Sequence, residues 1–373
     1  MRIQRLNTRL VFSYFIFLTL NIFYFFTFTL SHQFFLDTDG PGLFTFVLNG
    51  DSSKLYFPLF DTLISEGWSL VPPGGFISYI FFFLWNLFYF NPQDLIYVAF
   101  VVNNICIILS YVFFVKIGFE ILGLPLKYRY LYFFNPLLIY SSQLISKEAF
   151  LFFLIPLLFY SLYNKKYCWI FLSLVLLLLV RFQFTFLAFF GIVNLQIVRN
   201  SRHILLIFLL ILFCLLSWLL SESVDIESSS LSSAGFSRFA TQNQFYGIGS
   251  LLLVFPKIFV FFYDLISTSF FPFRGDSLSI YHSSALPIVI VLFSKYKQIF
   301  FIFMHPISIF ISTRSSLLIY ILFYLFILSA SPLIHGRYLW PILPLLLLLL
   351  LSVTALIRSN YVTKYSSHLT SLL

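Results

Sequence analysis

Charged residues are scarce in this chain of 373 residues: Asp, Glu, Lys and Arg together make up 9% of it. A typical soluble domain carries about 25%, so this composition excludes an ordinary soluble globular protein. Cysteine is also scarce, with three residues and no Cys-x-x-Cys pair. Neither a disulfide framework nor a zinc site is therefore expected, and we predict that the cysteines pack within apolar segments.

Apolar residues fill most of the chain: 60% are hydrophobic, 54 are Phe, and the mean hydropathy is +0.98. Several runs reach the about 20 residues that a helix needs to cross a bilayer, among them 10–30, 95–115 and 339–357. Such runs predict helices, because backbone groups in lipid must be satisfied internally, and they are too continuous for the strands of an outer-membrane barrel. The predicted fold class is all-α, a single polytopic membrane domain over residues 1–373 with about nine to twelve transmembrane helices.

Basic residues cluster in the short stretches between apolar runs and give the chain a net charge of +9. The positive-inside rule accounts for these clusters, so no nucleic-acid partner is expected. The clusters are Arg2/Arg5/Arg9, Lys165/Lys166, Arg199/Arg202, Lys295/Lys297 and Arg358/Lys364.

The charge pattern predicts cytoplasmic N- and C-termini, with the first apolar segment retained as an anchor rather than cleaved. Two larger external loops are expected at about 31–75 and 221–248. One difficulty arises: if every apolar segment crosses, residues 116–129 lie outside, against the charge rule. We therefore expect some of the short segments to be re-entrant or interfacial.

Acidic residues gather in the first of these loops, which holds five of the thirteen in the chain: Asp37, Asp39, Asp51, Asp61 and Glu66. Asp37 and Asp39 precede Gly-Pro-Gly, whose turn would hold two carboxylates on a bend just beyond the first span. Such a pair can share a divalent cation, or one carboxylate can act as a base while the other orients it. The alternative is a plain solvated loop, which we expect for the other three acids.

Three charged residues lie at or near membrane depth, where charges are costly and usually paired or functional. Lys147 and Glu148 lie between two short apolar segments, and Arg181 interrupts a long one. The alternatives are an exposed short loop for the first two, and for Arg181 an interfacial position between two spans.

Four further cations or titratable groups are expected on the outer face: Arg238, Arg274, His335 and Arg337. Arg238 is followed by amides and a tyrosine, which suit sugar hydroxyls and ring faces, whereas arginine suits a diphosphate. Each could instead be an ordinary loop residue, with Tyr338 and Trp340 serving as membrane-interface anchors. Acids and cations on one face suit a substrate with a lipid-linked phosphate leaving group, because a carboxylate can activate an acceptor hydroxyl while the cations hold the departing diphosphate.

Several short motifs resemble known families. The acidic pair, Pro72-Pro73-Gly74 before the second span and the segment 336–344 entering the last are similar to multi-spanning, GT-C-like bacterial glycosyltransferases with lipid-phosphate sugar donors. Asn135-Pro136 followed by Ser146-Lys147-Glu148 and Arg181 resembles the middle of O-antigen and related repeat-unit polymerases. Arg238 with Gly249 fits the Arg-x10-Gly pattern of an external loop in those polymerases.

The resemblance implies an inner-membrane glycosyltransferase of surface-polysaccharide (O-antigen or capsule) biosynthesis. It would polymerise undecaprenyl-diphosphate-linked repeat units at the outer face. By the same resemblance, Asp37 or Asp39 would be the base, and Arg238 would hold the lipid-linked glycan. The further substrate-binding candidates are Lys147, Glu148, Arg181, Arg274, His335 and Arg337.

Beyond a divalent cation at Asp37 and Asp39, no cofactor is expected. The expected partners are the undecaprenyl-linked glycan, membrane lipid, and a chain-length regulator or flippase. The alternatives are a transferase that adds single sugars from a polyprenyl-phosphate donor, a flippase for lipid-linked oligosaccharide, and a scaffold subunit. A flippase would favour charges along a central path and internal symmetry, and the sequence indicates neither.

Overall fold

The structure is a computed structural model that describes residues 2–26, 57–67, 76–89, 95–133, 135–143, 147–188, 214, 248–270, 273–274, 277–278, 314–330 and 336–353. This part of the chain is all-α, as predicted, apart from a two-residue antiparallel ladder between β1 (Phe273–Arg274) and β2 (Ser277–Leu278). Two of its helical stretches are long and apolar enough to cross a membrane, Tyr97–Ile121 and Tyr167–Ala188. The larger number of about nine to twelve crossings stays a prediction.

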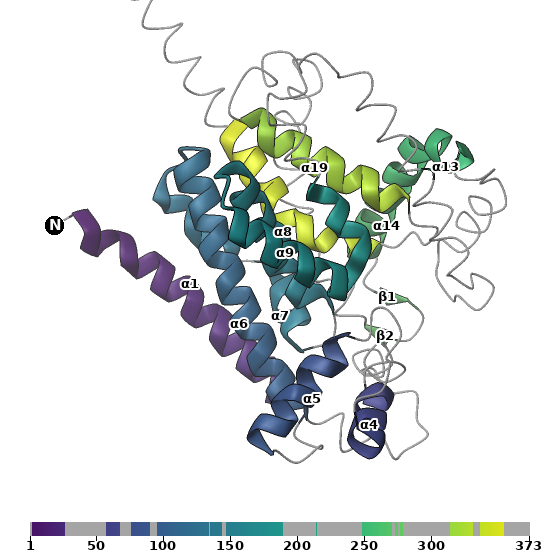
Figure 1. The fold of residues 1–373 in the computed structure, drawn as a ribbon. Coiled ribbons are helices and arrows are strands. Elements are labelled where there is room, and N and C mark those ends of the chain that lie inside the picture. Colours follow the sequence, from purple (N-terminus) through teal and green to yellow (C-terminus); the bar gives the residue numbers. More distant parts are fainter. Residues whose placement is uncertain are drawn as a thin grey trace, which may run out of the picture.

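The helices pack as one bundle (Figure 1). In chain order they are α1 (Arg2–Tyr24), α4 (Phe57–Glu66), α5 (Phe76–Phe88), α6 (Leu95–Lys116), the π-helical turn η4 (Ile117–Ile121), the 3₁₀ helix η5 (Leu126–Tyr132), α7 (Pro136–Gln143), α8 (Lys147–Tyr163), α9 (Tyr167–Arg181), the 3₁₀ helix η6 (Phe182–Ala188), α13 (Ile248–Leu252), α14 (Val254–Phe270), α19 (Arg314–Ser329) and the 3₁₀ helix η8 (Gly336–Ile342), which continues as an α-helix over residues 343–353.

Helices α1 and α6 run in opposite directions along each other (Figure 1). Phe25, just past the end of α1, packs on Phe100 near the start of α6, with ring centroids 4.3 Å apart. Nearer the start of α1, Tyr14 packs edge-on against Phe133, which follows η5 beyond the end of α6. The end of α6 therefore lies at the end of the bundle where α1 begins.

Helices α4 and α5 pack together at the start of α6. Phe60 and Leu63 of α4, Ile77 and Phe81 of α5 and Leu95 of α6 share a small core of their own. Helix α5 begins directly after the Pro-Pro-Gly-Gly break, and its 13 residues extend about 20 Å, less than the about 30 Å of a bilayer's hydrocarbon core. Residues 116–129 lie at the end of the bundle where α1 begins. The expectation that some short segments are re-entrant or interfacial stays a prediction.

Helices α7 and α8 form a short hairpin against α6. Asn103 Nδ2 donates to the carbonyl oxygen of Ser142 in α7 at 3.2 Å, and further along α6 Ser110 Oγ donates to the carbonyl oxygen of Phe152 in α8. Near the end of α6, Phe113 packs on Tyr160. The start of α8 therefore lies beside the middle of α6, where Glu148 is buried and Lys147 is half-buried.

The distribution of polar side chains is the reverse of that in a soluble helix. On α6, Asn103 and Ser110 are fully buried, whereas Val101 and Ile105 are more than half exposed. Exposed apolar residues continue along α1 and α9: Val11, Phe12, Phe15, Phe171 and Leu178. An apolar surface of this extent is typical of contact with lipid or with another protein.

The three cysteines are free. Cys106 is buried, as expected, and Cys214 is half-buried. The expectation of packing is wrong for Cys168, which is exposed on α9, a helix with an exposed apolar face.

Candidate functional site

The candidate site forms around Arg181, the last residue of α9. Its guanidinium carbon lies 4.1 Å from the centre of the Tyr338 ring in η8 and 5.5 Å from the centre of the Phe184 ring in η6. Because η6 continues α9 directly, Arg181 lies inside the apolar stretch Tyr167–Ala188. Two separate spans therefore do not meet at Arg181, and its depth in a membrane stays a prediction.

The guanidinium of Arg181 is half-buried, and in the described part of the chain it has no hydrogen-bond or ion-pair partner. Aromatic rings hold the guanidinium in place by stacking and cation–π attraction. Its five N–H donors form a planar fork that matches the paired oxygens of a carboxylate or a phosphate. This arrangement can therefore receive an anion.

Tyr324 of α19 ties the walls of the site together. Its hydroxyl donates to the carbonyl oxygen of Tyr338 at 2.6 Å, and its ring stacks on Phe184 at 4.7 Å. Helix α8, which carries Glu148, packs against both η8 and α19. The structure thus brings the helix of one sequence-predicted residue against the walls that surround another, Arg181.

Glu148 is 5% exposed and lies in the first turn of α8. A helix N-terminus carries partial positive charge, which favours a carboxylate there. The alternative of an exposed loop is therefore wrong for Glu148, whereas Lys147 beside it is half-buried.

Helix α14 forms a further wall of the site. Phe261 packs on Tyr338, with ring centroids 6.5 Å apart. One turn earlier, the fully buried Lys257 donates from Nζ to the carbonyl oxygen of Ser329 at 3.0 Å, at the end of α19. The partial negative charge at a helix C-terminus stabilises a cation in this position.

The sequence analysis did not single out several residues around the site. Lys257 carried a usable signal, a lone lysine inside an apolar run. Gln183, whose Nε2 is buried without a hydrogen-bond partner in the described segments, carried a weaker one. Tyr324 and Phe184 carried none, because the chain holds 23 Tyr and 54 Phe.

For the other candidate residues, the structure describes no side chain. Asp37, Asp39, Arg238 and His335 lie outside the described segments. Arg274 belongs to β1 and Arg337 to η8, next to Tyr338, but their side chains are not among those described. The divalent cation at Asp37 and Asp39 stays a prediction; within the described segments no group of three or more His, Cys, Asp and Glu gathers.

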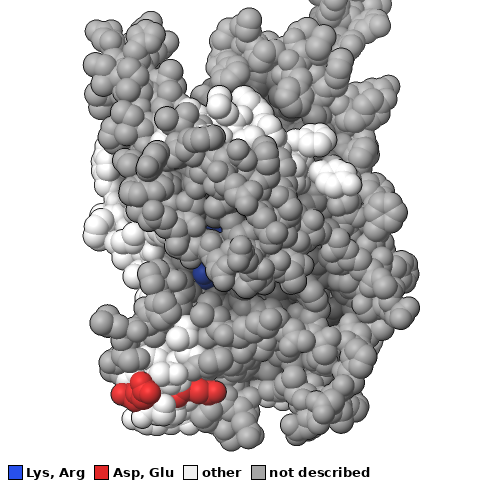
Figure 2. All heavy atoms as spheres, turned by 90° about the vertical axis from the view of Figure 1, so that its right-hand side faces the viewer, with Lys and Arg blue, Asp and Glu red and all other residues white. Residues whose placement is uncertain are grey.

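Two other expectations are decided by burial. Tyr338 and Trp340 are buried, at 8% and 2% exposure, so the alternative that they anchor the chain at a membrane interface is wrong. Asp61 and Glu66 of α4 are exposed, as expected for the solvated acids. Figure 2 shows acidic atoms on the surface at the lower end of the face, the end where α4 lies, and basic atoms recessed above them.

Comparison with known proteins gives no relative: no family model, curated protein or solved structure matches the chain.

Proposed function

We propose that the protein is an inner-membrane glycosyltransferase that polymerises undecaprenyl-diphosphate-linked repeat units of a bacterial surface polysaccharide. The observation that carries the proposal is Arg181, held on the Tyr338 ring of η8 inside an apolar stretch, with the buried Glu148 on α8, a helix that packs against η8. A cation fixed at this depth suits an anionic group attached to a lipid. A carboxylate nearby suits proton removal from an acceptor hydroxyl.

In the proposed reaction, the Glu148 carboxylate takes the proton of an acceptor sugar hydroxyl. The hydroxyl oxygen then forms a bond to the anomeric carbon of the donor, and the bond from that carbon to the diphosphate oxygen breaks. Arg181 stabilises the negative charge that the departing lipid diphosphate gains. The resemblance assigns the base to Asp37 or Asp39 instead, and substitutions distinguish the two assignments.

The arrangement of charge supports a multi-pass orientation with the termini in the cytoplasm. Lys116, Arg129, Lys165 and Lys166 belong to the end of the bundle where α1 begins, and the positive-inside rule assigns such an end to the cytoplasm. The helix over 343–353 leads to the same end, because Leu348 lies beside Gly118. The exposed acids of α4 lie at the opposite end, which would be external.

This orientation predicts the result of cysteine labelling. In a variant whose three cysteines are replaced by Ser, Glu66→Cys should react with a membrane-impermeant maleimide on intact spheroplasts. Lys165→Cys should react only after the membrane is permeabilised. Equal labelling of both positions before permeabilisation would contradict the orientation.

A flippase for lipid-linked oligosaccharide is the second candidate, and one observation favours it. Glu148 and Lys257 are buried between helices and Arg181 is half-buried, so charged side chains lie inside the bundle as well as on its surface. Interior charges of this kind also mark substrate paths through transporters. A null strain separates the two functions, because loss of a flippase strands repeat units inside the cell, whereas loss of a polymerase still exports single units.

Complementation of such a null strain tests the proposed function. We expect Arg181→Ala, Arg238→Ala and the double variant Asp37→Asn/Asp39→Asn to leave single repeat units at the surface, because each removes a charge that the proposed reaction or the resemblance assigns to the site. Asp61→Asn, an exposed acid of the same loop, should restore full chain length. Gel electrophoresis of the surface polysaccharide measures its chain length. Full-length chains from the first three variants would overturn those assignments.

A further inference from the structure

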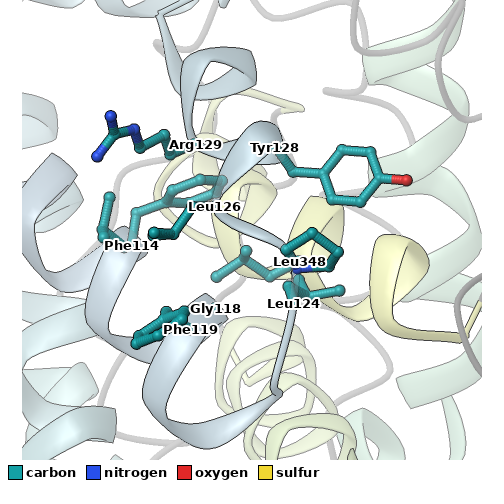
Figure 3. A pocket seen from close by; sticks show the side chains of 10 residues that line it. Phe114, Gly118, Phe119, Leu124, Leu126, Tyr128, Arg129 and Leu348 are labelled. Atoms are coloured by element: carbon teal, nitrogen blue, oxygen red, sulfur yellow. The ribbon is translucent and has the colours of Figure 1, made fainter. Parts of the chain in front are cut away.

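A shallow, open groove lies where α6 ends, at the opposite end of α6 from α4 and α5. Its apolar lining includes Phe114, Leu124, Leu126 and Leu348, and Arg129 lies at its rim. Figure 3 shows Arg129 and Tyr128 pointing to opposite sides of η5, with the leucines between and below them. The groove therefore has an apolar floor and a cation at one edge.

The chain builds this groove by reversing direction after α6. The π-helical turn η4 widens the end of the helix, with Leu122 N–H donating to the Ile117 carbonyl oxygen at 3.1 Å. Gly123 then takes a φ of +63°, which only glycine adopts readily, and the chain turns back into η5. Turns of the π type occur frequently at functional sites.

Close packing forms the floor. Leu348 approaches Gly118 so nearly that a Cβ at that glycine would lie 3.0 Å from Leu348 Cδ2. Leu348 and Leu124 are almost fully buried, whereas Leu126 is half-buried and Phe119 is exposed at the edge. The groove is therefore open on one side and closed beneath.

The surrounding charge at this end of the bundle is positive. Lys116 and Lys166 both lie over the Tyr160 ring, at 5.4 and 5.0 Å, and Lys165 is exposed nearby. The acidic residue there, Glu120, accepts a hydrogen bond from the Tyr160 hydroxyl at 2.8 Å. Clusters of basic residues beside an apolar span favour anionic lipid headgroups.

We propose that the groove binds an anionic phospholipid of the leaflet at this end of the bundle. Its phosphate lies against Arg129, and one acyl chain lies along Leu124 and Leu126. The combination of an apolar lining, a cation at its edge and a basic surround matches a ligand that is apolar along most of its length and anionic at one end. This site is separate from Arg181 and does not depend on the proposed enzymatic function.

Native mass spectrometry of the full chain in detergent, titrated with phosphatidylglycerol or phosphatidylcholine, tests the proposal. We expect the wild type to retain phosphatidylglycerol preferentially. Arg129→Gln should bind it about tenfold more weakly, since a charge-assisted contact is lost. Lys165→Gln is the matched control, because it removes the same charge from the same end outside the groove, and it should change binding less than about twofold.

A second variant keeps the test decisive if Arg129→Gln unfolds. Leu126→Trp fills the groove and leaves Arg129 in place, so it should lower phosphatidylglycerol retention at an unchanged melting midpoint. Three results would overturn the proposal: equal weakening by Arg129→Gln and Lys165→Gln, unchanged binding by a folded Leu126→Trp, or equal retention of phosphatidylcholine. Competition by inorganic phosphate alone would assign the site to free phosphate instead of lipid.

Discussion

Arg181→Ala is expected to weaken the binding of undecaprenyl diphosphate by roughly 10- to 100-fold. A hydrogen bond to a charged group contributes about 1.5–3 kcal/mol, and each 1.4 kcal/mol is about tenfold in affinity. Arg181 would contribute at least one such bond, because the structure holds its guanidinium on Tyr338 and shows no partner for its N–H donors in the described part of the chain. Microscale thermophoresis in detergent measures the affinity.

Two further variants sharpen this result. Arg181→Lys keeps the charge but loses the planar fork and the ring stacking, so its affinity should lie between those of wild type and Arg181→Ala. Lys166→Ala removes a cation that also lies over a tyrosine ring, at 5.0 Å from the centre of Tyr160, but far from the site. Its affinity should equal that of wild type, and a loss equal to that of Arg181→Ala would show a general effect of surface charge.

Glu148→Gln is expected to lower the rate of chain elongation by about 10²–10⁴-fold, the usual contribution of a positioned general base. Glutamine keeps the size of the side chain and removes the charge that would accept the proton. The affinity for undecaprenyl diphosphate should not fall, because the substitution removes a negative charge that would repel the anion. Elongation in proteoliposomes supplied with the repeat-unit substrate measures the rate.

The same assay decides between the two assignments of the base. Asp37→Asn and Asp39→Asn are measured beside Glu148→Gln, with the melting midpoint of each variant as the control for folding. Full elongation by Glu148→Gln together with its loss in either aspartate variant would assign the base to the acidic pair of the first loop.

Composition alone predicts much of the fold. The long apolar run 95–115 predicts α6 with little ambiguity, since it is too continuous for a barrel strand and a helix satisfies its own backbone in lipid. The short runs were harder: the 13 residues of α5 are enough for a helix and too few for a crossing, and only its packing on α4 and α6 shows that it lies at one end of the bundle. The hairpin of α7 and α8 was ambiguous for the same reason.

The site was predictable in part. Glu148 and Arg181 were identified from the sequence because an ionised side chain at membrane depth is costly and needs a reason. Their proximity was not predictable, because it depends on which helices pack together. Tyr338 lies under Arg181 and accepts a hydrogen bond from Tyr324, and neither tyrosine differs in sequence from the many others.

An experimental structure of the full chain with undecaprenyl diphosphate bound in nanodiscs tests the central claim most directly. The account predicts phosphate oxygens within about 2.7–3.2 Å of the Arg181 guanidinium nitrogens, with the guanidinium still resting on the Tyr338 ring and Glu148 facing the sugar side of the diphosphate. A bound diphosphate elsewhere in the molecule, with Arg181 paired to a protein carboxylate, would contradict it.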